Sequence, residues 1–198
     1  MYRPTNEAQF IGPARRFATA LSSLARAAGR DPIAVLLWGA PGIGKTALAT
    51  HFARSFPGDS NVVTFNGTQL GIDEVEQIGR DLRYRDMFGR RRIWQIEEVD
   101  QVTAKAQIRL LTILDNLPAD TAFVCTTNVS PDQLQERFQT RFTPFEITPP
   151  TGDEIEALLK QFNLPPAAAK AIAHMCGGNV RQALLDANAA FTANLMAA

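Results

Sequence analysis

Residues 39–46 read GAPGIGKT, which is the pattern Gly, any four residues, Gly-Lys-Thr. The apolar run at residues 33–38 comes directly before it, so the pattern predicts a buried strand, a glycine-rich turn and a helix that opens at Thr46. Glycines let successive backbone N–H groups close around phosphate oxygens, and the helix N-terminus adds a favourable dipole. Lys45 suits the β- and γ-phosphates, and the hydroxyl of Thr46 suits Mg²⁺. The stretch therefore predicts nucleotide binding over the alternative of a glycine-rich turn without a ligand.

The composition is that of a globular protein with one large domain, or a domain with a small appendage. The chain has 198 residues, is 45% hydrophobic and carries zero net charge, so overall charge does not point to nucleic acid. Cys125 and Cys176 lie far apart and lack the spacing of a metal site or a disulfide framework. Since no signal-like or membrane-spanning run is present, we expect a soluble, cytoplasmic protein with no membrane partner.

Strands and helices alternate along most of the chain. Strands are expected at residues 33–38, 61–66, 92–96, 121–127 and 142–147. Helices are expected at residues 13–28, 46–56, 73–85 and 103–117, with a short one from Ser130-Pro131. This alternation predicts an α/β fold with a parallel sheet covered on both faces.

Pro149-Pro150 marks the expected domain boundary. After it the pattern is helical throughout, beginning with the capping box from Thr151 to Glu154. We therefore expect a nucleotide-binding domain at residues 1–149 and a small lid of three helices at residues 150–198.

Glu97 and Glu98 follow the strand at residues 92–96. A carboxylate at the tip of a buried strand beside a phosphate loop can hold Mg²⁺ directly or through water, and an adjacent carboxylate can orient the attacking water. The alternative is an ordinary exposed strand end. The position after a strand, in a chain that already has the phosphate loop, favours the catalytic pair.

With these motifs the chain resembles the AAA+ ATPases, and within them the small subunits of clamp loaders. The resemblance extends through nearly all 198 residues, with six motifs in the same order. The matching segments are Tyr2-Arg3-Pro4, Phe10-Ile11-Gly12, Val63-Thr64-Phe65-Asn66, Gly71-Ile72-Asp73, Glu97-Glu98-Val99-Asp100, Ala106-Gln107, Leu110-Leu111, Phe123 to Asn128, Thr140-Arg141-Phe142 and Gly178-Asn179-Val180-Arg181.

The resemblance implies a role for each polar residue in these motifs. Asn128 would sense the γ-phosphate, Arg181 would reach the nucleotide from the lid, and Arg141 would be an arginine finger that acts in a neighbouring subunit. Glu98 would orient water, and Glu97 would hold Mg²⁺ with Thr46. The implied strand order is 5-1-4-3-2. The implied ATP contacts also include Ile11, Gly12, Ala40, Pro41, Gly42, Ile43, Gly44, Lys45 and Ala47.

Each implied role has a structural alternative. Asn128 could cap the turn before Ser130, Arg141 could be an ordinary surface arginine, and Arg181 could pair with Asp186 or Glu154. The order of the motifs favours the functional interpretation.

The chain departs from the family pattern at several positions. Glu97 stands where the family has an aspartate, and its extra methylene displaces the carboxylate by about 1 Å or more, which matters for positioning. Gln95 interrupts an otherwise apolar strand, and Phe142 replaces a family cysteine. The helical collar of clamp-loader subunits and the four-cysteine zinc site of some bacterial relatives are not expected here.

Two groups of residues are candidates for contact with DNA. The basic concentration comprises Arg80, Arg83, Arg85, Arg90, Arg91 and Arg92. It could contact phosphates, although a solvated surface that pairs with Asp81, Asp86 or a neighbouring subunit is the favoured alternative. By resemblance, Thr103 and Lys105 are the better DNA candidates, because in ring-forming relatives their helix faces the central channel.

Three functions are compatible with these observations. The first is an oligomeric ATP-driven switch, a ring or spiral of one or several kinds of subunit, that acts on DNA with a replication or transposition protein. The second is an ATP-dependent remodeller of a protein partner without DNA contact. The third is a slowly hydrolysing or non-hydrolysing nucleotide-dependent scaffold, which the glutamate at position 97 keeps open as an alternative.

Overall fold

The computed structural model describes residues 4–84, 86–134, 136–162 and 164–197. Tyr2 and Arg3 of the N-terminal motif, and Arg85 of the basic concentration, lie outside the described residues. Within the described part of the chain, no helix combines the length and the apolar character needed to cross a membrane.

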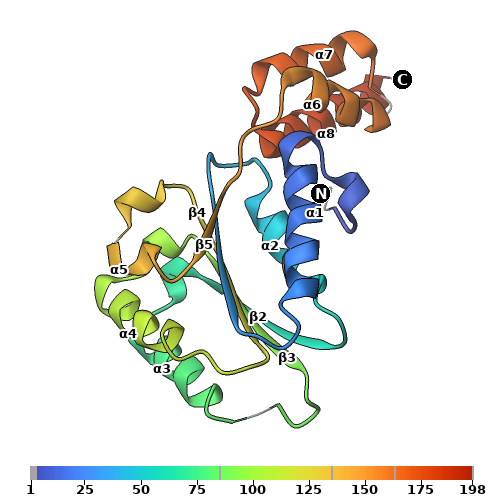
Figure 1. The fold of residues 1–198 in the computed structure, drawn as a ribbon. Helices are drawn as coiled ribbons and strands as arrows, with labels where there is room; N and C mark the ends of the chain where they lie inside the picture. Colours follow the sequence, from blue (N-terminus) through green and yellow to red (C-terminus); the bar gives the residue numbers. More distant parts are fainter. Residues whose placement is uncertain (1–3, 85, 135, 163, 198) are drawn as a thin grey trace.

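The core of the fold is a parallel sheet of five strands (Figure 1). The strands are β1 (Ile33–Trp38), β2 (Ser60–Asn66), β3 (Arg91–Glu97), β4 (Thr121–Thr127) and β5 (Thr143–Glu146). Their order across the sheet is β2-β3-β4-β1-β5, and every neighbouring pair is parallel. The expected order 5-1-4-3-2 and the α/β class are therefore confirmed.

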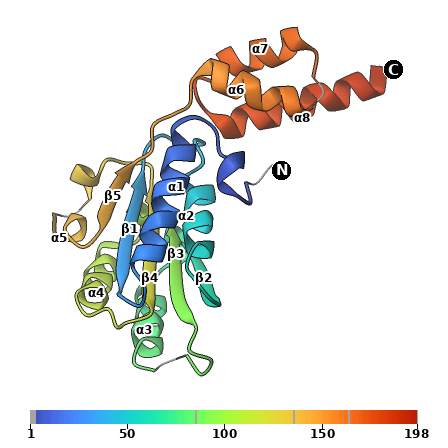
Figure 2. The ribbon, with the colours of Figure 1, turned by 45° about the vertical axis from the view of Figure 1, so that its right-hand side comes forward.

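Helices cover both faces of this sheet, as Figures 1 and 2 show from two directions. The α-helices are α1 (Gly12–Ala27), α2 (Lys45–Arg54), α3 (Ile72–Asp81), α4 (Ala104–Leu114), α5 (Glu136–Gln139), α6 (Gly152–Leu159), α7 (Pro166–Met175) and α8 (Val180–Ala197). Short 3₁₀ helices are η1 (Glu7–Gln9), η2 (Gly67–Gln69), η3 (Val99–Gln101), η4 (Pro131–Gln133) and η5 (Lys160–Phe162).

Each face of the sheet has its own hydrophobic cluster. Leu37 and Val124 pack with α1 and α2, whereas Leu36 and Phe123 pack with α3 and α4. Successive side chains of a strand point to opposite faces, so a strand covered on both sides must be apolar at nearly every position. This requirement explains the runs IAVLLW and TAFVCTT, and all seven residues of β4 are buried.

Two helices end earlier than expected. Helix α3 ends at Asp81 rather than near residue 85, and α4 ends at Leu114 rather than at residue 117. Pro118 disfavours helical geometry at the residue before it, so the chain leaves the helix ahead of the proline. Thr103 caps α4, because its hydroxyl accepts a hydrogen bond from the Ala106 amide.

Ser130 precedes the expected short helix, but its side chain makes no capping hydrogen bond. Its hydroxyl donates to Asp132 at 3.2 Å, and the segment that follows is the 3₁₀ helix η4.

The last three helices form a cluster of their own at the end of the sheet that carries the phosphate loop (Figure 1). Thr151 caps α6 and Glu154 accepts from the Thr151 amide, which completes the expected capping box. Ile11 packs against this cluster from the N-terminal segment. The assignment of residues 1–149 and 150–198 to separate domains stays a prediction.

Arg91 is the clearest exception to the expectation of a solvated basic surface. It is 5% exposed, lies 4.5 Å over the ring of Phe56, and donates to the backbone carbonyls of Gly29 and Thr121. The guanidinium thus ties β3 to the loop after α1. Its role in the described structure is packing, which the run of three arginines at residues 90–92 does not reveal.

Candidate nucleotide-binding site

The phosphate loop connects β1 to α2, as the sequence predicts. Gly42 and Gly44 adopt φ angles of 79° and 103°, a region that disfavours any side chain. A Cβ atom at Gly42 would overlap the side chain of Asn179, so the loop approaches the C-terminal helices closely at this glycine. Along the loop, Ala40 and Pro41 are exposed, Ile43 is buried, and Ala47 is half-buried on α2.

Lys45 is the first residue of α2, and its ammonium group is held at the mouth of the loop. Nζ donates to the carbonyls of Gly39 and Ala40 and to Oδ1 of Asn128, each at 2.8 Å. Burial, and next the positive charge of Arg181, lower the pKa of Lys45 to about 8. The structure therefore brings together three predicted site residues, Lys45, Asn128 and Arg181, although they are far apart in the sequence.

Thr46 and Glu97 offer two oxygen ligands side by side. The Thr46 hydroxyl donates to Oε2 of Glu97 at 3.4 Å, although the two residues are 51 positions apart. Hydroxyl and carboxylate oxygens are ligands suited to Mg²⁺, which usually takes only one or two protein groups together with phosphates and water. The donor set therefore fits the predicted magnesium position.

Glu98 has an unusual backbone conformation. Its φ and ψ angles are both 53°, in the left-handed region that few residues other than glycine adopt. Its amide donates to the Thr126 hydroxyl at 3.3 Å, and a Cβ atom at Gly67 would overlap the Glu98 carbonyl. Strained conformations of this kind persist where the surroundings impose them, and they cluster at functional sites. The negative charges of Asp100 and then Glu98 partly oppose the lowering of the Lys45 pKa by burial and Arg181.

The C-terminal helices contact the loop through the first residues of α8 and Asn179 before it. The Arg181 amide donates to the Gly42 carbonyl at 3.0 Å, and Oδ1 of Asn179 accepts from the Gln182 amide at the same distance. Gly12, with φ of 53°, opens α1 next to Glu154 and Pro150. Loop, N-terminal segment and helical cluster thus meet at one end of the sheet.

Arg141 is not part of this group. It follows α5, and its Nε and Nη2 donate to the carboxylate of Asp115 at 2.7 and 3.3 Å. The hydrogen bond from Arg141 lowers the pKa of Asp115, and the Asp115 carboxylate raises that of Arg141. The role of Arg141 in a neighbouring subunit stays a prediction.

The DNA candidates Thr103 and Lys105 are exposed at the start of α4.

The arginines of the basic concentration make different contacts from one another. Arg90 pairs with Asp86 at 3.0 Å, which agrees with the expected surface pairing.

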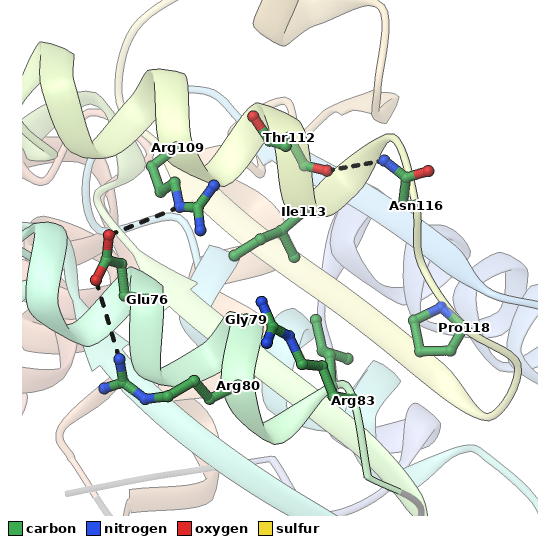
Figure 3. A pocket seen from close by; sticks show the side chains of 10 residues that line it. Glu76, Gly79, Arg80, Arg83, Arg109, Thr112, Ile113, Asn116 and Pro118 are labelled. Carbon is green, nitrogen blue, oxygen red and sulfur yellow. Dashed lines mark hydrogen bonds and ion pairs between the residues drawn. The ribbon is translucent and has the colours of Figure 1, made fainter.

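Arg80 and Arg83 line a groove between α3 and α4, which Figure 3 shows from close by. The groove has a volume of about 520 Å³. Glu76 lies between Arg80 and Arg109, at 3.9 and 4.0 Å from their guanidinium nitrogens, and partly neutralises this surface.

Gln95 and Thr50 belong to the neighbourhood of Glu97, yet the sequence assigned them no role. Gln95 is buried in β3 and donates to Oε1 of Glu97 at 3.1 Å, while the Thr50 hydroxyl lies 3.4 Å from Oε1 of Gln95. A polar residue inside an apolar strand was the signal that could have identified Gln95. Nothing in the local pattern distinguishes Thr50 from other helical threonines.

Comparison with known families assigns the chain to a family. The model of the ATPase family associated with various cellular activities (AAA) matches residues 35–149, which is more than half of the chain. The chain belongs to the AAA ATPase family. The matched segment contains the phosphate loop, both glutamates and Asn128.

Three relatives are each 27% identical to this AAA chain. They are replication-associated recombination protein A of Escherichia coli, over 92% of the chain, DNA polymerase III subunit gamma/tau of Mycobacterium bovis, over 75%, and the replication factor C small subunit of Methanoregula boonei, over 92%. The resemblance to clamp-loader subunits is therefore confirmed. The chain spans 43, 30 and 59% of the lengths of these relatives.

Among solved structures, the chain resembles Thermotoga maritima RuvB, described as a Holliday junction branch migration motor. The TM-score is 0.74 at 24% identity, over 91% of this chain and 62% of that one. At this identity the similarity shows a shared fold.

Proposed function

We propose that this chain binds ATP with Mg²⁺ and hydrolyses it as part of an oligomeric ATP-driven switch in DNA replication or mobile-element processes. The observation that carries the proposal is the convergence of Lys45, Asn128 and the Thr46–Glu97 pair at one edge of the sheet. Membership of the AAA family and the replication-related names of the relatives support it.

In the proposed reaction, the residues of the loop bind the phosphates. Lys45 exchanges its hydrogen bonds to Gly39, Ala40 and Asn128 for phosphate oxygens, so that its ammonium group faces anionic acceptors in place of neutral ones. Asn128 is then available to contact the γ-phosphate or the attacking water. Thr46 and Glu97 would hold Mg²⁺, which neutralises charge on the β- and γ-phosphates when it is bound.

Glu98 is proposed as the general base. Its carboxylate would accept a proton from the attacking water, while the left-handed backbone, held by Thr126 and Gly67, keeps the side chain at the strand tip. Arg181 would respond to the γ-phosphate from the helices at residues 150–198, which act as a lid in this proposal. The hydrogen bond from the Arg181 backbone amide to the Gly42 carbonyl supports that role.

Arg141 would complete the site of a neighbouring subunit. It lies with Asp115 rather than with Lys45, so an arginine contribution from Arg141 requires a second chain. A contact of this kind is heterologous and generates a ring or spiral.

Turnover of ATP with and without primed DNA tests this proposal. We expect measurable hydrolysis by the wild-type chain that DNA increases, and a loss of about 100-fold or more in kcat for Glu98→Gln with nucleotide affinity retained. Lys105→Glu should lower DNA affinity and its salt dependence, whereas Lys170→Glu, a charge reversal on α7, should not.

Other outcomes would replace the proposal with its alternatives. Turnover without any DNA effect would favour the protein remodeller. Nucleotide binding without turnover would favour the scaffold, an alternative that the glutamate at position 97 keeps open.

A further inference from the structure

Gln95 is a buried amide in the middle of an otherwise apolar strand. It is 3% exposed and lies between Trp94 and Ile96, which are 3% and 0% exposed. Burying an amide is unfavourable unless its donors and acceptor find partners. The position of Gln95 in β3 therefore needs an explanation from its contacts.

Its contacts lead directly to Glu97. Residues two apart in a strand point to the same face, and Nε2 of Gln95 donates to Oε1 of Glu97 at 3.1 Å. A carboxylate only accepts hydrogen bonds, so the NH₂ side of the amide must face Glu97. The other side of the amide then faces α2, where the Thr50 hydroxyl lies 3.4 Å from Oε1 of Gln95.

These contacts fix both oxygens of the Glu97 carboxylate. Oε1 accepts from Gln95, and Oε2 accepts from the Thr46 hydroxyl at 3.4 Å. Thr50 shares its single hydroxyl proton between Gln95 and the Thr46 carbonyl, which is 3.0 Å away. The two polar departures in β3, Gln95 and Glu97, are thus bonded to each other and to α2.

The length of the glutamate explains why such a contact matters. A glutamate has one more rotatable bond than an aspartate, so its carboxylate samples more positions unless a neighbour holds it. Groups behind a metal ligand commonly set its orientation, and their loss weakens metal affinity about 10- to 100-fold.

We propose that Gln95 is a positioning residue that orients the Glu97 carboxylate toward Thr46. Through this contact a glutamate can serve as the carboxylate ligand of the metal ion beside the phosphate loop. The proposal rests on the metal role of Glu97 in the function proposed above. It accounts for two departures from the family pattern with one interaction.

The test measures binding of Mn²⁺, as a probe for Mg²⁺, to the chain carrying one equivalent of ADP. Free Mn²⁺ is followed by electron paramagnetic resonance, and ADP affinity without metal and Tm are measured alongside. Gln95→Leu removes the amide, and Gln95→Met removes it while keeping a long flexible chain, in case the leucine variant does not fold. Gln107→Leu is the matched control, since Gln107 is a buried glutamine that bonds to Val102 instead.

We expect Gln95→Leu and Gln95→Met to weaken Mn²⁺ affinity about tenfold while metal-free ADP affinity and Tm stay the same or Tm rises. Gln107→Leu should leave Mn²⁺ affinity unchanged. In a Glu97→Asp background the same Gln95 substitutions should change Mn²⁺ affinity by less than about twofold, because the shorter side chain does not reach the amide.

An equal loss in both backgrounds, or no loss in the wild-type background, overturns the inference. The Glu97→Ala variant distinguishes failure of the positioning role of Gln95 from failure of the proposed function. If Glu97→Ala weakens Mn²⁺ binding and the Gln95 variants do not, only the positioning role is lost. If Glu97→Ala leaves Mn²⁺ binding unchanged, the metal role of Glu97 is wrong, and the positioning role falls with it.

Discussion

Two cationic side chains of this molecule, Lys45 and Arg141, lie in opposite electrostatic situations. Lys45 is 7% exposed and bonds to three neutral oxygens, whereas Arg141 has a side chain 31% exposed and bonds to the carboxylate of Asp115. Burial lowers the pKa of Lys45 to about 8, while the Asp115 carboxylate raises that of Arg141. The charge of Lys45 is therefore destabilised and will gain from a phosphate, but a phosphate must compete with Asp115 for Arg141.

One chain therefore assembles the proposed phosphate-binding part of the site and leaves Arg141 outside it. The two centres can therefore be perturbed separately, and substitutions at each should affect different quantities.

The largest expected effect is that of Arg141→Ala on turnover. If Arg141 stabilises transition-state charge in a neighbouring subunit, kcat should fall by about 1,000-fold or more while ATP affinity stays the same. Steady-state turnover and equilibrium titration with an ATP analogue measure the two quantities. Arg137→Ala, an exposed arginine on α5, is the control and should change neither.

Mixing Arg141→Ala with Lys45→Ala tests whether the arginine acts between subunits. Each variant supplies what the other lacks, so the mixture should recover part of the activity if the arginine acts between subunits. Absence of recovery in a mixture that still forms oligomers would contradict the action of Arg141 in a second chain.

An intermediate effect is expected from pH at Lys45. The protonated amine attracts phosphate and predominates below the lowered pKa of about 8, so ADP affinity should be highest below pH 8 and fall above it. Between pH 7 and pH 9 the decrease should approach tenfold, since each pH unit above a pKa removes about nine tenths of the remaining charge. Titrations of ADP without metal across this range measure it.

Lys45→Ala is the control for that titration. It should bind ADP about 10- to 100-fold more weakly at pH 7 and show no decline near pH 8. An unchanged decline in this variant would assign the titration to another group.

The smallest effect should come from Asp115→Asn. Exposed ion pairs contribute little, so we expect turnover to rise by less than about fivefold as Arg141 is released from a competing carboxylate. Turnover at limiting protein concentration is the sensitive measurement. A large fall, similar to that of Arg141→Ala, would mean that Asp115 presents the arginine instead of competing for it.

Strand positions were the most predictable part of this fold. The expected strand at residues 121–127 coincides with β4. A central strand is apolar on both faces, so both of its ends can be located in the sequence. Helix ends were less predictable, as α3 and α4 show, since propensity continues past the point where packing against the sheet stops. Arg91 was predicted to be on a solvated surface, and only the position of Phe56 and the carbonyl groups around it explains its burial.

The fold family and the phosphate loop could be predicted from the sequence, because strand, glycine turn and helix are adjacent in the chain and their pattern is local. Which polar groups from distant segments stand together depends on the tertiary structure: Lys45 with Asn128, Arg141 with Asp115, and Gln95 with Thr50 of α2. These pairings depend on strand order and on which face each residue occupies. Such relations arise when segments 26 to 83 positions apart are brought to hydrogen-bond distance, and no local pattern specifies them.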